Sequence, residues 1–143
     1  MFLGEHTHSI DPKGRVVLPS RFRPDLAKGC FITKGQDRCL FVFTPEAWEQ
    51  EVERIRSLPR TDRKLRNYSR VFFAGAIDQK PDKQGRIQLP ATLRDYAGLD
   101  KEVTVVGVGE RVEIWDSAKW QEVTAAGDVE YADIEEALSE HGI

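Results

Sequence analysis

Cysteine is scarce in this sequence of 143 residues, in which Cys30 and Cys39 are the only two. They flank the turn predicted at residues 35–37, so they could face each other across a hairpin. A disulfide is the less favoured interpretation, and we expect two small buried apolar residues in a reducing compartment. A zinc site would need more ligands at closer spacing.

Long apolar runs are also missing. No stretch approaches the roughly 18 apolar residues of a membrane-spanning helix, and the first residues do not form a charged and then apolar signal segment. We therefore expect a cytoplasmic protein that does not associate with membranes.

Enzyme motifs are absent as well. The serines lie in no nucleophile elbow, no carboxylate pair is spaced for acid and base, and Gly107 and Gly109 belong to no phosphate-binding loop. His6 and His8 would face one side of a strand and could share a metal with Asp11, but such a pair without a further ligand is more often an accident of the surface. We expect no catalysis, no metal, no cofactor and no small-molecule ligand.

Charge is distributed unevenly along the chain. The composition, 40% hydrophobic and 31% charged, suits one ordinary domain or two small fused units. Residues 1–94 hold 18 Lys and Arg against 11 Asp and Glu, whereas residues 95–143 hold 3 against 13. Although the net charge is −3, this segregation predicts a face that binds a polyanion, with the acidic part turned elsewhere.

One turn motif occurs twice, at residues 11–15 (DPKGR) and 82–86 (DKQGR). Asp at the first position of a type I turn can bond its own backbone two residues on, and glycine at the fourth position can take φ > 0. The pattern predicts a three-residue hairpin loop with a glycine bulge, followed at once by a strand that a proline ends. Each arginine should then reach outward from a hairpin tip.

The repetition extends beyond the turn. At an offset of 71 residues the matching pairs are Phe2 and Phe73, Gly4 and Gly75, Leu18 and Leu89, Pro19 and Pro90, and Arg23 and Arg94; after one inserted residue Trp48 matches Trp120. The sequence therefore predicts two copies of a unit of about 70 residues that share one core, too few for a solenoid.

Local patterns predict the other elements. Thr44 followed by Pro45 indicates a helix start, and Trp48, Val52 and Ile55 form its buried stripe. Helices are further expected at 19–28, from Thr61 or Asp62 onward, and at 90–96 with Gly98 as the cap; strands are expected at 30–34, 39–43, 73–80, 86–89, 102–108 and 112–115. In the helix after Asp62, the basic residues either touch phosphates or, as we favour, pair with Glu49, Glu51 and Glu53.

Several motifs taken together resemble the MraZ family of bacterial transcriptional regulators. They are the opening MFLG, FAGA at 73–76, DKQGRI at 82–87 and EIWD at 113–116, with both turns. The resemblance implies a mainly β, α+β fold of two tandem AbrB/MazE/MraZ-like swapped-hairpin units that form a pseudo-symmetric double-split β-barrel with flanking helices. The expected division is a first unit at 1–59, a basic connecting helix at 60–72, a second unit at 73–127 and an acidic tail at 128–143.

The resemblance also implies a function. We expect a sequence-specific DNA-binding regulator, a repressor of the division and cell-wall gene cluster and of its own promoter, associated with the nucleoid and forming ring-like homo-oligomers on short DNA repeats. Arg15 and Arg86 would read bases, Lys13 and Lys83 would hold phosphates, and Asp11, Gly14, Asp82 and Gly85 would shape the turns. The alternative is an oligomeric scaffold or an antitoxin-like binder of a protein partner.

The acidic end admits two interpretations. Residues 128–143 hold six Asp or Glu and no Lys or Arg, while Tyr131, Ile134 and Leu138 share one helical face. The favoured interpretation is a solvated terminus. The alternative is a short helix that docks by its apolar stripe and weakens non-specific DNA binding.

Overall fold

Each half of the chain contains four strands, with a helix between the second and the third. The computed structural model describes residues 1–143. Its elements are β1 (Phe2–Ser9), β2 (Arg15–Val17), α1 (Arg23–Leu26), β3 (Cys30–Lys34), the short 3-10 helix η1 (Gln36–Arg38), β4 (Leu40–Phe43), α2 (Pro45–Arg56), α3 (Arg63–Ala74), β5 (Ile77–Gln79), β6 (Arg86–Gln88), α4 (Ala91–Ala97), β7 (Glu102–Gly109), β8 (Val112–Asp116), α5 (Ser117–Tyr131) and α6 (Glu135–Ser139). None of the helices is long and apolar enough to cross a bilayer.

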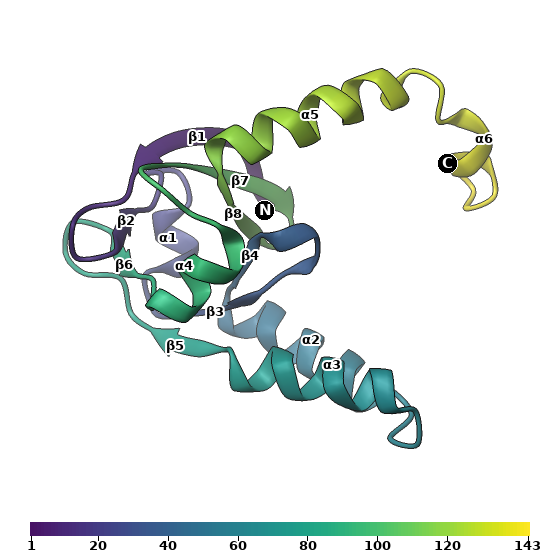
Figure 1. Ribbon diagram of the computed structural model, residues 1–143, viewed down its shortest axis with the longest axis horizontal. Helices are drawn as coiled ribbons and strands as arrows, with labels where there is room; N and C mark the ends of the chain where they lie inside the picture. The colour runs from purple at the N-terminus through teal and green to yellow at the C-terminus, as the bar shows by residue number, and fades with distance from the viewer.

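The strands of one half of the chain pair with strands of the other half. Each strand of the first half pairs antiparallel with one of the second, as β1 with β7, β2 with β6, β3 with β5 and β4 with β8. The larger sheet has the order β1-β7-β8-β4-β3-β5, and β2 and β6 form a separate pair (Figure 1). The α+β class with two tandem repeats is confirmed. The hydrogen-bonded order ends at β1 and β5, so the strands do not close into a complete barrel.

This pairing between halves shows that the predicted local hairpins are wrong. The residues before and after each turn were expected to form a hairpin, yet β1 does not pair with β2, nor β5 with β6. The expected strand at 73–80 is also too long, because α3 runs through Ala74 and only Ile77–Gln79 is extended. Phe72 belongs to the buried face of that helix, where its ring stacks on Trp48 with centroids 5.3 Å apart.

Two hydrophobic clusters hold the halves together. The larger cluster includes the equivalent pairs Val16 with Ile87 and Leu18 with Leu89, all with no exposed surface. The smaller one surrounds Trp48, which Phe31 and Phe72 sandwich. Because each half supplies part of both clusters, neither half has a core of its own.

The helix ends follow the sequence signals. Thr44 accepts a hydrogen bond from the Ala47 N–H at 3.1 Å, Asp62 accepts one from the Leu65 N–H at 3.2 Å, and Gly98 ends α4 with φ +61°. Trp48, Val52 and Ile55 are buried as predicted. In contrast, the expected helix at 19–28 is a single turn at Arg23–Leu26.

Both cysteines are free and buried, as expected. Cys30 lies in the larger cluster and Cys39 in the smaller one, so they do not face each other. Burial is the main cause that raises the pKa of each thiol to about 12, which leaves both unreactive at neutral pH.

Two features project from the body. The helices α2 and α3 form one projection, and α5 carries the C-terminal residues away as another (Figure 1). The apolar stripe predicted at the end of the chain does not dock, because Tyr131 is 81% exposed and Ile134 is 39% exposed.

Candidate nucleic-acid interface

The first turn is closed by its own aspartate. The Gly14 N–H donates to the Asp11 carbonyl at 2.9 Å, and the Asp11 N–H donates to the Arg15 carbonyl at 3.0 Å. Asp11 Oδ1 accepts from the backbone N–H groups of Lys13 and Arg15 at 2.9 and 2.8 Å. Gly14 has φ +80°, as the glycine-bulge prediction requires.

The second turn repeats this geometry. The Gly85 N–H donates to the Asp82 carbonyl at 2.9 Å, and the Asp82 N–H donates to the Arg86 carbonyl at 3.0 Å. Asp82 Oδ1 accepts from the N–H groups of Gln84 and Arg86 at 3.0 and 2.8 Å, and Gly85 has φ +77°. The short side chain of aspartate thus replaces water at the backbone donors of the turn.

Each turn holds its own arginine. Arg15 Nε donates to Asp11 Oδ2 and Arg86 Nε donates to Asp82 Oδ2, both at 2.7 Å. The exposed fractions of the two arginine side chains are 27% and 30%, so they do not extend freely outward as the sequence analysis predicted. No protein acceptor contacts either Nη of Arg15, and these donors remain free for a ligand.

Backbone donors keep both aspartates ionised. The hydrogen bond from the Arg15 N–H is the largest cause that lowers the pKa of Asp11, and the Arg86 N–H does the same for the pKa of Asp82. The arginine side chains lower both pKa values further. At neutral pH each arginine therefore faces a full negative charge.

Strand exchange places the two turns side by side. In the β2–β6 pair Val16 lies opposite Ile87. The Leu18 N–H donates to the Gly85 carbonyl at 2.8 Å, and its equivalent Leu89 donates to the Gly14 carbonyl at 2.9 Å. Each turn is thus bonded to the strand that follows the other turn. Figure 1 shows both turns at the left edge of the molecule, away from the two projections.

Two further arginines, Arg23 and Arg94, pack against the turns. The sequence analysis did not assign them to the site. A Cβ atom on Gly14 would lie 2.8 Å from Nη1 of Arg94, and one on Gly85 would lie 2.5 Å from Nε of Arg23. Each arginine therefore packs on the turn of the other half, and Arg23 also donates to the Leu18 carbonyl at 2.9 Å. The match of Arg23 with Arg94 at an offset of 71 was the signal that could have found them.

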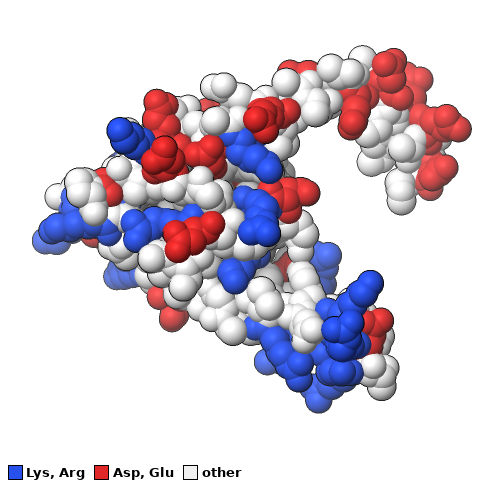
Figure 2. All heavy atoms as spheres, in the orientation of Figure 1, with Lys and Arg blue, Asp and Glu red and all other residues white.

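The surface around the turns is basic. Lys13 and Lys83 are exposed and form no ion pair. Figure 2 shows Lys and Arg at this edge and Asp and Glu gathered on the C-terminal projection. On α2, Arg54 and Arg56 take Glu51 and Glu53 as partners, so the expected pairing of these glutamates with the basic residues of α3 is not present.

The two histidines of β1 lie close to this surface. His6 and His8 are half-buried, and the Nε2 atom of each is buried without a hydrogen-bond partner. No group of three or more potential ligands suitable for a metal ion is present. Burial lowers the pKa of His8, with smaller contributions from His6 and Arg23, so His8 is neutral at pH 7.

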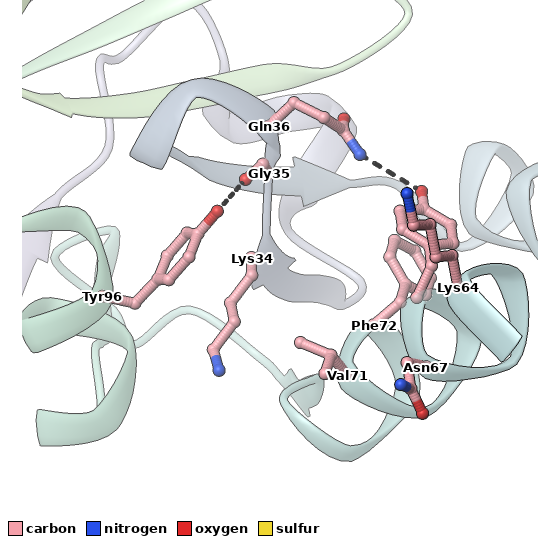
Figure 3. A pocket seen from close by; sticks show the side chains of 9 residues that line it. Lys34, Gly35, Gln36, Lys64, Asn67, Val71, Phe72 and Tyr96 are labelled. Carbon is pink, nitrogen blue, oxygen red and sulfur yellow. Dashed lines mark hydrogen bonds between the residues drawn. The ribbon is translucent and has the colours of Figure 1, made fainter.

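The chain also has a cavity of about 380 Å³ beside α3, away from the turns. Aromatic rings of Tyr68, Phe72 and Tyr96 and the side chains of Lys34 and Lys64 line it, and the Tyr96 hydroxyl donates to the Gly35 carbonyl (Figure 3). No carboxylate, histidine, serine or cysteine lines this cavity, so the usual nucleophile and base pairs are missing there.

Comparisons with known proteins agree with this architecture. The family model for MraZ protein, described as antitoxin-like, matches residues 1–71 and again residues 72–140. The protein named transcriptional regulator MraZ from Salinispora arenicola is 50% identical over 138 residues, which are 96% of this chain and 97% of that protein. Those with the same name from Micrococcus luteus and Acetivibrio thermocellus are 48% and 46% identical, covering 95% and 100% of both chains. The chain therefore belongs to the MraZ family.

Proposed function

We propose that this protein regulates transcription by binding specific DNA sequences through its paired turns. The relatives' names support a transcriptional regulator, and the geometry supports DNA as the ligand. The single observation that carries the proposal is the adjacency of two equivalent Asp–Arg clamps, fixed by the β2–β6 pair and by the bonds from Leu18 and Leu89 to the opposite glycines.

The clamps suit recognition of base edges. A two-stranded β element fits the major groove, where arginine can donate two hydrogen bonds to guanine O6 and N7. Because Asp11 holds Arg15 at Nε, the guanidinium is oriented before DNA arrives and loses less conformational freedom on binding. In this proposal Lys13 and Lys83 contact phosphates and set the register of the protein on the duplex.

The finer assignment follows the family resemblance. We propose repression at short, regularly spaced repeats upstream of the division and cell-wall genes and of the protein's own gene. One chain offers two arginine clamps, which is a small footprint, so several linked chains would be needed for high affinity. A homo-oligomer bound to repeated sites meets that need.

Substitution of the clamp arginines tests the proposal. We expect Arg15→Ala and Arg86→Ala each to reduce discrimination between the upstream DNA and a scrambled duplex by about 1–3 kcal/mol, roughly 5- to 150-fold. Gel shift or fluorescence anisotropy measures this, and thermal melting checks that the fold persists. Arg54→Ala on α2, whose side chain is 78% exposed, is the control and should bind as the wild type does. A clamp variant that melts normally and retains its selectivity contradicts the proposal.

A protein partner is the second candidate, because the family description is antitoxin-like. A salt titration of binding to duplex DNA separates the two. Neutralised phosphates give a steep negative slope of log K against log salt, about 0.9 per phosphate. A protein-binding scaffold would show no specific DNA complex at any salt concentration.

A further inference from the structure

The cavity of about 380 Å³ beside α3 lies outside the proposed DNA interface. Three segments that are distant in sequence form it, namely the end of β3 with the loop that follows, one face of α3, and α4. Its volume falls within the range of small-molecule sites, about 300–1,000 Å³. Because these residues come together only in the fold, the sequence could not indicate such a site.

Aromatic rings face the cavity from two sides. On α3, Tyr68 and Phe72 stack on each other with ring centroids 6.1 Å apart. Tyr96 on α4 lies opposite Phe72, with Lys34 and Val71 between them (Figure 3). Opposed rings favour a flat aromatic ligand, because such a ligand can pack its faces on both walls and exclude water from them.

The cavity is positively charged. Lys34 and Lys64 line it, neither forms an ion pair, and no Asp or Glu is among the lining residues. Lys34 is half-buried, and its Nζ lies 5.3 Å from the centroid of the Tyr96 ring rather than beside a carboxylate. An adjoining hollow that shares Lys34 adds Arg70 and again has no carboxylate. A ligand that carries a negative charge would therefore supply the counter-ion that these cations lack.

Hydrogen-bond donors are available at the same place. The Tyr68 hydroxyl accepts from the Gln36 amide at 3.4 Å, so its own proton can be donated to a ligand. The Oδ1 atom of Asn67 accepts from Arg70 Nη1 at 3.1 Å, which leaves the amide N–H groups of Asn67 free. A carboxylate, which only accepts hydrogen bonds, matches these donors and the two ammonium groups.

The walls of the cavity are fixed without a ligand. The Tyr96 hydroxyl donates to the Gly35 carbonyl, which holds the ring in place. The Thr33 hydroxyl donates to the Phe72 carbonyl at 2.7 Å and joins α3 to β3. A Cβ atom on Gly35 would lie 2.5 Å from the Phe41 ring, so the loop after β3 packs closely on the smaller cluster. A preformed cavity loses less conformational freedom when a ligand binds.

We propose that this cavity binds a small planar aromatic carboxylate. The ring system of the ligand lies between the walls that Phe72 and Tyr96 form. Its carboxylate faces Lys34 and Lys64 and accepts from the Tyr68 hydroxyl. The site does not depend on the proposed DNA binding, because it shares no residue with the turns and is tested without DNA.

Binding of 2-naphthoate tests the proposal. Saturation-transfer difference NMR observes the ligand and gives its dissociation constant whatever the size of the protein. 2-Naphthoate should bind saturably. Methyl 2-naphthoate, which lacks the charge, and decahydro-2-naphthoate, which lacks the flat ring, should each bind about tenfold more weakly.

Substitutions locate the binding. Val71→Asp adds a carboxylate at a lining position that is 49% exposed, so the fold should persist while 2-naphthoate binding is lost. Lys34→Gln with Lys64→Gln should weaken 2-naphthoate binding about tenfold and leave that of the methyl ester unchanged. The control is Val129→Asp, the same substitution at a position of α5 that is 76% exposed and outside the cavity, and it should bind as the wild type does.

Thermal melting checks that each variant is folded, and if Val71→Asp does not fold, the double lysine variant decides in its place. Three results would each overturn the proposal: no saturable binding to the wild type, equal affinities for the acid, its ester and its saturated analogue, or wild-type affinity in the cavity variants. Loss of binding in the Val129→Asp control would also overturn it, because binding would then not depend on the cavity.

Discussion

The first and second turns share the hydrogen bonds that shape them and differ in the side chains between. In both, the aspartate accepts the arginine N–H at 2.8 Å and the arginine Nε at 2.7 Å. Pro12 and Lys13 in one copy correspond to Lys83 and Gln84 in the other. The aspartate, glycine and arginine therefore determine the backbone shape of each turn. The two positions between the aspartate and the glycine can vary to suit a ligand.

The arginines that pack on the turns differ in a second way. A Cβ atom on Gly14 would contact the end of the Arg94 side chain. One on Gly85 would contact Nε and Cδ of Arg23, near the middle of that side chain. Arg23 is in addition held by the Leu18 carbonyl. The second turn should therefore tolerate added bulk less well than the first.

Valine in place of the turn glycines should have the largest effect. Both Gly14→Val and Gly85→Val force a β-branched residue to φ > 0, which costs about 1–3 kcal/mol. Gly85→Val should lose about 1–3 kcal/mol more through overpacking against Arg23. Urea unfolding measures both losses. In the Gly85→Val variant, the additional substitution Arg23→Ala should recover only the part of the stability loss that comes from overpacking. Equal stability losses in the two variants would contradict the difference between the turns.

Substitution of the turn aspartates should separate folding from orientation of the arginine. Asp82→Ala removes the acceptor of two backbone N–H groups and of Arg86, so the melting temperature should fall. Asp82→Asn keeps an oxygen for the backbone but presents an amide to Arg86, so it should melt nearer to the wild type while DNA affinity still drops. Asp11 should behave in the same way. An Asn variant with unchanged affinity would show that the clamp does not orient the arginine.

Exchange of the variable lysine should change chiefly the salt dependence of DNA binding, although Gln84→Lys also removes the oxygen that accepts from Arg86 Nη2 at 3.3 Å. Lys13→Gln gives the first turn the residue of the second, and Gln84→Lys does the reverse. We expect the slope of log K against log salt to become shallower by about 0.9 in the former and steeper by about 0.9 in the latter. The Lys13 carbonyl, which accepts from Gln88, is backbone and is retained. Unchanged slopes would place both positions outside the DNA contact.

The smallest effect concerns His8, whose equivalent in the second half is Gln79. The ordinary His pKa is 6.5 and burial lowers that of His8, so the unfolded chain takes up a proton first as the pH falls. Stability should be constant above pH 7 and decline below about 6.5 until His8 in the folded state is protonated too. Melting between pH 7.5 and 5.5 measures the decline.

His8→Gln should flatten this pH dependence. Gln79 bonds both the N–H and the carbonyl of Gln88 at 2.7 Å, and a glutamine at position 8 could make the same bonds to Val17. A His8→Gln variant that retains the full decline would show that another group is responsible.

Much of the local structure was predictable because its causes are local. Asp, Pro and Gly define the first turn, and Thr44 and Asp62 mark helix starts, within a few residues of sequence. The exchange of strand partners was not predictable from those residues, because a turn determines how the chain reverses and not which strand lies beside it afterwards. The resemblance to a swapped-hairpin family was needed for that.

The candidate site was predictable in composition and less so in geometry. The repeated motif identified Arg15 and Arg86, but nothing in it indicated that Nε would be held by the preceding aspartate. The support from Arg23 and Arg94 crosses between halves and so depends on the tertiary fold. α5 was missed because its residues show no apolar stripe, and Gly127 lies within it.

The pairing of Phe2 with Gly109 bears on how the protein is made. During synthesis β1 leaves the ribosome first, and β7, its partner along all eight residues, follows about a hundred residues later. Long-range pairing of this kind slows folding, since a large loop must close before any contact stabilises it. A nascent chain that ends after the first repeat would leave β1 and β2 without a partner strand and the β3–β4 pair with both edges open, so the doubled sequence must fold as one cooperative whole.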